Sequence, residues 1–525
     1  MAIITSRRRA SSIKVQVRSR VSLLRSQQLL TGGSGVPMFY RRTRLGRRTT
    51  INMLPDNVLL EIFDFCQIES SSRMISLRPA SDWLRLVHVC QRWRHIVLVS
   101  PRRLDLTLFC TFGTPVRKNL GSLPPFPVIV DYLTFADFRN PAPDYNDDII
   151  AALKHSDRVR AIKLFVTNSL CGVVASAMQE PFPALTTLWL SSNDQDAPVL
   201  PVFLSGPAPH LLQIFLEGIS FPKLPTLLSS ASNLVDLQLD DIPQSGYISP
   251  EVMATSLAPL SRLDTLHICF KAPISRLQLG SSPVTTRHIL PSLVRFNFRG
   301  SSEYLEHLLA QIDTPRLSAI NITYFNQLDF QVPQLSQFIR RTEHLERFWS
   351  RNLHGRIRIS SLDVGLDFQE EGHHGSPLTL RISCKWLDWQ VFHLTQILAQ
   401  TPAMVSNVEH LSIDEDDLQL EPGWKEDDTD DTDWLELLRP FITVNKLHGS
   451  RQLAGHIALA LGSVSGEMIT EILPALASLS LEGRREESVE KFLAARQISG
   501  HPVNFVDQGK CEFIIAVVPS RLRHL

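Results

Sequence analysis

The sequence predicts a mixed α/β protein in which a small helical region precedes a long solenoid of irregular strand-and-helix repeats. Three observations lead to this prediction. Residues 1–50 are basic and contain no acid, residues 51–98 carry two apolar stripes with helical spacing, and from Val159 one apolar pattern recurs at nearly regular intervals. Apolar residues make up 43% of the 525-residue chain and charged residues 20%, as in globular proteins with large cores.

The first fifty residues carry eleven Arg and one Lys, so the rest of the chain has a net charge of −12. This composition is typical of a mitochondrial presequence, but Ile13, Val15 and Val17 alternate with polar residues instead of forming a helical face. GGSG at 32–35 would also break a helix. We expect a disordered basic tail over residues 1–50, or a start codon placed too far upstream. Mitochondrial import, or a tail that contacts nucleic acid or directs the chain to the nucleus, is the alternative.

Two helical patterns follow this tail. In LPDNVLLEIFDFC, residues 54–66, Pro55 suits the first helical position and Asp56 the positive end of the helix dipole. The second pattern is DWLRLVHVCQRWRHIVLVSP, residues 82–101. Each has one broad apolar stripe, which two short helices cannot bury against each other alone. Either the rest of the chain covers these stripes, or another protein does.

The two patterns together resemble the F-box, in which Leu-Pro and an apolar Leu-Ile-Phe helix precede Val-Cys-x-x-Trp. The matching residues are Leu54, Pro55, Leu59, Ile62, Phe63, Val89, Cys90 and Trp93. The resemblance implies that these residues dock on a Skp-type adaptor protein, which joins an F-box protein to a cullin–RING ubiquitin ligase. Asn57 and Cys66 depart from the family pattern, where an acid and Leu are common. The resemblance predicts an F-box over residues 51–110 and a linker over 111–150.

Past residue 150, an apolar residue is followed by others three and five positions later. The first eight units begin at intervals of 26, 26, 23, 29, 30, 24 and 28 residues, at Val159, Leu185, Leu211, Leu234, Leu263, Leu293, Leu317 and Leu345. Two more units begin further on, at Val408 and Leu476. This period matches leucine-rich repeats. Each unit leaves an apolar edge that only its neighbours can cover, so the units would stack into a solenoid over residues 151–525. A generic α/β domain is the alternative.

The first, fourth and sixth residues of each unit would point into the core, because the last three positions alternate as in a strand. Helical stretches at 301–312 and 389–400 separate units, and Pro often stands two residues before the first core position, as an entry to the strand. LTLRISC at 378–384 can be a further strand. The acidic stretch at 421–434 is expected to be a solvated loop, with a docking site for a basic partner as the alternative.

In such a solenoid the third, fifth and seventh side chains of each unit share one exposed face of the sheet. The candidate target-binding residues on this face are Trp189, Phe215, Gln238, Asp240, His267, Arg295, Asn297 and Arg299, and the fifth-position column continues to Asn321 and Trp349. Aromatic side chains and charges of opposite sign suit the recognition of a protein. The alternative is a solvated sheet face without a partner.

Signatures of catalysis are missing from the sequence. GSVSG at 462–466 has Val where a nucleophile elbow needs Ser, and GGSG lacks the Lys of a phosphate-binding loop. His373 and His374 have no third ligand at a metal-site spacing. We therefore expect no enzyme activity in this chain, no metal and no cofactor, and nothing favours a nucleic-acid partner over a protein.

The cysteines and the hydropathy suggest where the chain resides. Seven cysteines are scattered without paired spacing, which indicates reduced thiols inside a cell, in the cytoplasm or the nucleus. No apolar run approaches the ~18–20 residues that a membrane span needs. We expect no membrane partner.

The resemblance also extends beyond the two modules. VHVCQRWRHIVLVSPRRLDLTLFCTFGTPVRK, NITYFNQLDFQVPQLSQFI and LAARQISGHPV are similar to segments of the large F-box families of mushroom-forming fungi. The resemblance implies a substrate-recognition subunit of a Skp–cullin–F-box ubiquitin ligase, which binds the adaptor through the F-box and a target protein through the repeats. An adaptor-binding scaffold or assembly protein without a degradative role is the alternative. No motif supports a third class, a repeat-domain enzyme or a nucleic-acid binder.

Overall fold

A computed structural model describes residues 51–71, 82–100, 104, 106–112, 116–122, 124–133, 146–200, 208–273, 287–370, 376–415, 431–482 and 487–506. The expectations for the basic tail at 1–50, for His373 and His374, and for most of the acidic stretch lie outside these residues. By its contacts the chain divides into two units, with the boundary between Glu61 and Ile62.

Three helices and a short turn of 3-10 helix make up the N-terminal described region, namely η1 (Ile51–Met53), α2 (Asp56–Ser71), α3 (Asp82–Val87) and α4 (Gln91–Val99). The predicted second helix is therefore two helices, and the prediction of one continuous stripe over residues 82–99 was wrong. Cys90 is the reason, because its extended backbone (φ −161°, ψ 168°) ends one helix and caps the next.

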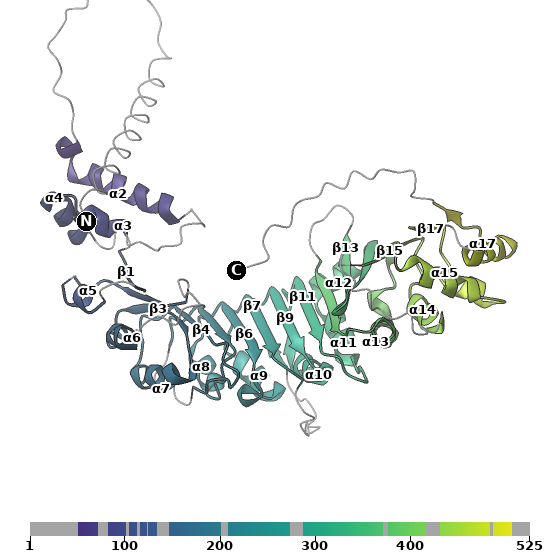
Figure 1. The fold of residues 1–525 in the computed structure, drawn as a ribbon, viewed down its shortest axis with the longest axis horizontal. Helices are drawn as coiled ribbons and strands as arrows, with labels where there is room; N and C mark the ends of the chain where they lie inside the picture. Colours follow the sequence, from purple (N-terminus) through teal and green to yellow (C-terminus); the bar gives the residue numbers. More distant parts are fainter. Residues whose placement is uncertain are drawn as a thin grey trace, which may run out of the picture. The chain divides into compact units, whose positions relative to one another are not determined.

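The rest of the described chain alternates strands and helices (Figure 1). The strands are β1 (Leu108–Cys110), β2 (Val128–Asp131), β3 (Val159–Phe165), β4 (Thr187–Ser191), β5 (Gln213–Glu217), β6 (Asp236–Ile242), β7 (Thr265–Phe270), β8 (His288–Ile289), β9 (Arg295–Gly300), β10 (Ile312–Asp313), β11 (Ala319–Tyr324), β12 (Leu353–Ile359), β13 (Asp363–Glu370), β14 (Leu378–Ser383), β15 (Val408–Glu415), β16 (Lys446–Gly449), β17 (Ser478–Leu481) and β18 (Asn504–Phe505). The helices are α5 (Val116–Ser122), α6 (Asn146–Leu153), α7 (Asn168–Ala177), α8 (Leu224–Ser230), α9 (Pro250–Leu257), α10 (Ser302–Gln311), α11 (Pro333–Arg341), α12 (Glu343–Trp349), α13 (Leu387–Gln400), α14 (Asp431–Leu438), α15 (Ala454–Ser463), α16 (Met468–Glu471) and α17 (Glu487–Ile498), with 3-10 turns η2 (Gln244–Gly246) and η3 (Pro402–Met404).

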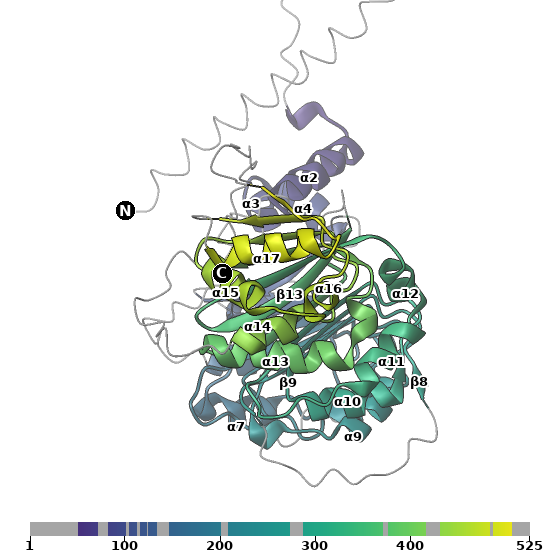
Figure 2. The ribbon, with the colours of Figure 1, turned by 90° about the vertical axis from the view of Figure 1, so that its right-hand side faces the viewer.

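Sixteen of these strands form one sheet, in the order β1-β2-β3-β4-β5-β6-β7-β9-β11-β14-β13-β12-β15-β16-β17-β18. Neighbouring strands are parallel except where β13 runs antiparallel to β12 and to β14. The helices lie along one face of the strands and pack on one another in sequence, for example α8 on α9 and α9 on α10 (Figures 1 and 2). This is the strand-and-helix solenoid that the repeats predict.

Each regular strand begins with the same turn, which explains the recurring Pro. The N–H of Leu185 donates to the carbonyl of Phe182 at 3.1 Å, and the N–H of Leu317 donates to that of Thr314 at 3.2 Å. Pro183 and Pro315 occupy the second position of these four-residue turns, where the fixed φ of proline fits. In these units, the prediction that Pro marks the entry to the strand is confirmed.

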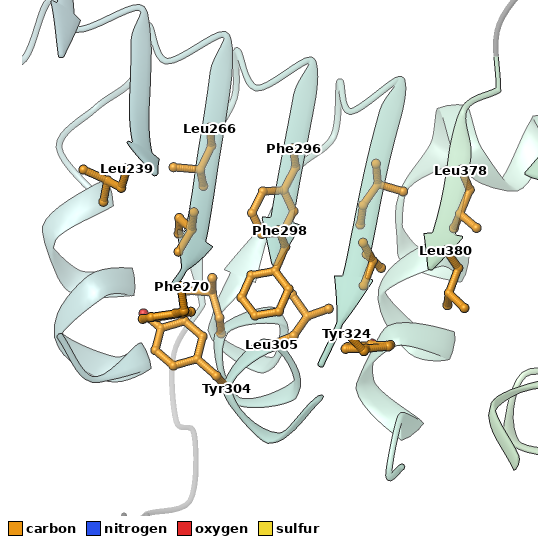
Figure 3. Packing of buried hydrophobic residues seen from close by; sticks show 14 of the residues in the cluster. Leu239, Leu266, Phe270, Phe296, Phe298, Tyr304, Leu305, Tyr324, Leu378 and Leu380 are labelled. Atoms are coloured by element: carbon orange, nitrogen blue, oxygen red, sulfur yellow. The ribbon is translucent and has the colours of Figure 1, made fainter. Parts of the chain in front are cut away.

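The core lies between the strands and the helices and follows the predicted alternation. The first-position residues from Val159 to Leu317 are fully buried, as are the fourth-position residues Leu188, Leu237 and Leu266. Near the middle of the sheet, Phe270 and Phe298 pack on the buried Tyr304 of α10, with ring centroids 4.8 and 5.9 Å away (Figure 3). Continuous burial from repeat to repeat replaces the separate core of a globular domain.

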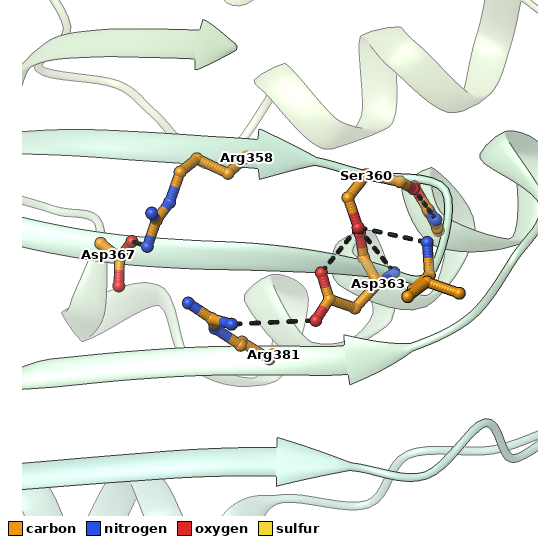
Figure 4. Close-up of polar contacts among 7 residues, drawn as sticks. Arg358, Ser360, Asp363, Asp367 and Arg381 are labelled. Carbon is orange, nitrogen blue, oxygen red and sulfur yellow. Dashed lines mark hydrogen bonds and ion pairs between the residues drawn. The ribbon is translucent and has the colours of Figure 1, made fainter. Parts of the chain in front are cut away.

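Strands β12, β13 and β14 form an up-and-down insert within the otherwise parallel sheet. Gln390 of α13 is completely buried and holds it, because its side-chain amide donates to the carbonyl oxygens of Ser360 and Cys384. Ser360 also accepts the N–H of Asp363 at 3.0 Å, and Arg358 forms an ion pair with the buried Asp367 (Figure 4). These contacts fix the β12–β13 turn and align the three strands.

One predicted repeat, just before this insert, is wrong. LERFWS from Leu345 was expected to be a strand, but Glu343–Trp349 form the helix α12. Glu343 and Glu346 near its start, Arg347 near its end and a Glu343–Arg347 ion pair all favour a helix. Trp349 is 7% exposed and packs edge-on against Phe368 at 4.6 Å, so it belongs to the core and not to the exposed column.

The expected linker at 111–150 is also corrected, because β2, which lies within it, pairs with both β1 and β3 of the main sheet, and α5 packs on α6. One repeat was missed. It begins at the buried Val444 and has Gly449 at the sixth position, where Ile457 and Leu481 leave no room for a side chain. A Cβ on Gly449 would come within 2.8 Å of both of these residues.

Other predictions are confirmed by the described residues. The strand expected at 378–384 is β14, and the expected helices at 301–312 and 389–400 are α10 and α13. The acidic stretch is described only from residue 431, where it begins α14. None of the described helices is both long and apolar enough to span a membrane.

Candidate protein-interaction sites

The helical region shows why Val-Cys-x-x-Trp forms a structural unit. The sulfur of Cys90 accepts the backbone N–H of Trp93 at 3.5 Å and so caps α4. The indole of Trp93 packs on the ring of Phe63, with centroids 4.7 Å apart. Arg94 donates from Nε to the carbonyl of Val87 at 3.0 Å, which ties α4 back to α3. The pattern thus sets the connection between the two helices.

The eight residues that match the F-box motif differ in exposure. Leu59 and Phe63 are buried, whereas Leu54, Ile62 and Trp93 are half-buried. Pro55 and Cys90 are exposed, and Val89 is an exposed apolar residue with 57% of its surface accessible. The buried members support the helices, and Pro55 and Val89 offer apolar surface that another protein can contact.

On the sheet, the predicted fifth-position column is a continuous ladder of neighbouring residues. Strand pairing places Trp189 beside Phe215, and the ladder continues through Gln238, His267, Asn297 and Asn321. Beyond Asn321 the neighbour is Thr379 of β14, not Trp349. We call the sheet surface that carries the third-, fifth- and seventh-position side chains the ladder face.

The ladder face begins with an aromatic pair. The rings of Trp189 and Phe215 are 4.3 Å apart between centroids and tilted by 38°. Lys163 lies 6.0 Å from the Trp189 ring and 3.7 Å from Asp131, whose carboxylate is almost fully buried. Both side chains are half-buried, so part of each stays accessible to a partner.

The charges at the centre of the ladder face are paired within the chain. Arg295 donates to Asp264 and to Thr265, both at 2.7 Å. The side chain of His267 lies 3.7 Å from Asp240 and holds the pKa of that carboxyl below its ordinary value. Strand β7 lies between β6 and β9, yet the side chain of Arg299 on β9 still reaches Asp241 of β6 at 4.0 Å.

Amide side chains occupy the next part of the ladder. Asn321 donates from its side chain to Asn297 at 2.7 Å, and Gln238 donates to Asp236 at 3.0 Å in its own strand. Arg299 lies 4.0 Å from Asp241 and 5.7 Å from the Phe325 ring. The candidate residues from Trp189 to Arg299 therefore form one connected surface of aromatic, amide and paired charged groups.

Sequence reasoning missed a second exposed aromatic group. Trp386 and Trp389 at the start of α13 are 62% and 41% exposed, and they line a surface hollow with Asn326 and Asp388. Exposed tryptophans mark protein contacts more often than other exposed residues do. The spacing of three in KWLDW was the available signal, because it puts both indoles on one side of a helix start.

A comparison with protein families identifies the helical region. The model of the F-box-like family matches residues 51–103. Among solved structures, the leucine-rich repeat-containing protein LegL7 from Legionella pneumophila is similar, with 11% identity and a TM-score of 0.24 over 75% of this chain and 98% of that chain. No curated protein matches the chain.

The family match covers the three helices and the Val-Cys-x-x-Trp connection described above. The repeat fold is established by the parallel strands and their register, independently of the weak similarity to LegL7. Residues 51–103 are an F-box-like domain, and a leucine-rich-repeat-like solenoid follows it.

Proposed function

We propose that this chain is the substrate-recognition subunit of a Skp–cullin–F-box ubiquitin ligase. The observation that carries the proposal is the F-box-like domain at 51–103 in the same chain as a sheet of sixteen strands. F-box domains bind Skp-type adaptors, and a long sheet face is suited to holding another protein. In this proposal the chain acts in the cytoplasm or the nucleus.

The adaptor would bind the F-box helices through Leu54, Pro55, Leu59, Ile62, Phe63, Val89, Cys90 and Trp93. Direct contact is proposed for the exposed Pro55 and Val89, while the buried Leu59 and Phe63 set the positions of the helices. An apolar residue that is 57% exposed leaves surface in water that a partner can bury.

The target protein would bind the ladder face. Trp189 and Phe215 supply aromatic area at one end, and Asn297 and Asn321 supply amide groups further along. This chain would contribute position and not chemistry, because holding a target near the ubiquitin-loaded enzyme raises its effective concentration. That role needs no catalytic residue in the receptor.

The test is a reconstituted ubiquitin-transfer assay on proteins captured by the full chain. Capture is compared between wild type and Trp189→Ala, and transfer is compared between wild type and the double variant Leu54→Ala, Pro55→Ala. We expect Trp189→Ala to lose captured proteins, and the double variant to keep capture but lose ubiquitin transfer. Adaptor binding without any transfer would instead favour a scaffold, and the absence of adaptor binding would reject both functions.

A further inference from the structure

Strands β6 and β7 bring three metal-ligating side chains together at the centre of the ladder face. Ligand atoms of Asp240, His267 and Cys269 all lie within 4.8 Å of one another. The three residues belong to two different repeats, so no short motif links them in the sequence.

A β-bulge lies directly beside this cluster. Leu239 pairs with Ile268 and Ile242 pairs with Phe270, so Asp240 and Asp241 of β6 lie opposite the single residue Cys269 of β7. Asp241 has a φ of +46°, which a residue other than glycine rarely adopts. Bulges of this kind redirect side chains and occur frequently beside functional sites.

The cluster is open on one side and closed on the other. The side chains of His267 and Asp240 are 25% and 37% exposed, whereas Cys269 is only 7% exposed. A small ion can therefore approach the imidazole and the carboxylate from solvent and reach the sulfur beneath them.

We propose that Asp240, His267 and Cys269 bind a divalent transition-metal ion, with zinc as the best fit. Imidazole, carboxylate and thiolate are all zinc ligands, at about 2.0–2.3 Å from the ion, and a thiolate selects against magnesium and calcium. These bond lengths separate the ligand atoms of a tetrahedral site by about 3.3–3.7 Å. The ligand atoms, now within 4.8 Å of one another, would have to come closer, and three protein ligands leave the fourth position open.

The surrounding charges set the conditions for binding. Asp241 and Glu217 lie on either side of Asp240, in its own strand and in the neighbouring strand, and favour a cation. Arg299, the residue paired with Cys269 on β9, opposes it.

The experiment is a titration of the full chain, stripped of metal with a chelator, with Co²⁺ as the spectroscopic probe. Wild type should give the visible bands of four-coordinate Co²⁺ and a near-ultraviolet sulfur-to-cobalt charge-transfer band. Cys269→Ser should lose the charge-transfer band, and His267→Gln should weaken binding at least ~10-fold. Arg299→Gln should tighten it, because a positive charge near the ion is removed.

The matched control is Cys171→Ser, since Cys171 is another buried thiol whose sulfur donates to the carbonyl of Val199. This variant should keep the wild-type spectrum. A wild-type chain without the charge-transfer band overturns the proposal, as does a Cys269→Ser variant that keeps it. If Cys269→Ser does not fold, unchanged Co²⁺ affinity in His267→Gln has the same consequence. The proposal does not depend on the function proposed above.

Discussion

Replacing Glu306 by Gln should remove a pH dependence from the stability of the repeat region. Glu306 lies on α10, is 8% exposed, and accepts the backbone N–H groups of Gln334 and Leu335, the latter at 2.9 Å. These amides belong to the first turn of α11, whose N-cap residue Val332 offers no side-chain acceptor. Glu306 therefore caps a helix of the next repeat.

Burial raises the pKa of Glu306 from 4.5 to about 7, although the two amide N–H groups act in the opposite direction. Between these two pH values the folded protein keeps a proton that the unfolded chain has released. Stability therefore falls as pH rises through this window. Because one pKa unit corresponds to about 1.4 kcal/mol, the full loss is about 3 kcal/mol, of which about 2 kcal/mol lies between pH 5.5 and 8.

The assay is urea unfolding followed by circular dichroism at pH 5.5 and pH 8, on wild type, Glu306→Gln and Glu303→Gln. Glu303 is an exposed acid of the same helix and serves as the control. We expect wild type to lose about 2 kcal/mol relative to Glu306→Gln on going to pH 8, and Glu303→Gln to follow wild type. A wild type that gains stability relative to Glu306→Gln would show that the amide bonds outweigh burial, and would refute the reasoning.

Three further outcomes are expected. In urea unfolding, Gly218→Ala should destabilise the protein by about 2 kcal/mol or more, because Gly218 has a φ of +65° and a Cβ there would lie 2.2 Å from the carbonyl oxygen of Ser192. The control Gly172→Ala, in α7 with open space around it, should not lower the urea midpoint. Gln390→Leu should cost about 2–4 kcal/mol in urea unfolding, since it leaves two carbonyl oxygens without their donor, and a loss below ~1 kcal/mol would contradict the role given to Gln390. Trp189→Ala should reduce the set of proteins captured by the full chain without lowering its melting temperature by more than a few degrees, and an unchanged set would remove Trp189 from the target site.

The regular part of the fold could be predicted because burial repeats with a fixed spacing. A strand that is covered on one side needs apolar residues at alternate positions, and each turn into the strand favours Pro at its second residue. Leu185 and Leu317 satisfy both rules, so the sequence placed their strands correctly. The ladder from Trp189 to Asn321 follows from the same register.

The errors come from places where one pattern satisfies two structures. Leu345 and Phe348 are three residues apart, which fits both the repeat and one face of a helix, and the Glu343–Arg347 pair favours the helix. The repeat that begins at Val444 was missed because Gly449 stands at its sixth position, where the side chains of Ile457 and Leu481 fill the core. The cluster of Asp240, His267 and Cys269 joins two different repeats, so no short sequence motif marks it.

Adaptor binding by the F-box-like domain is the central claim, and a titration of the full chain with a purified Skp-type adaptor tests it most directly. The informative variant is Val89→Asp, which puts a charge on an apolar residue that is 57% exposed; Val252→Asp, on α9 and 47% exposed, is its matched control. We predict that wild type and Val252→Asp bind with equal affinity and that Val89→Asp binds at least ~10-fold more weakly, a loss of about 1.4 kcal/mol. Failure of the wild-type chain to bind the adaptor, or equal binding by Val89→Asp, would contradict the account.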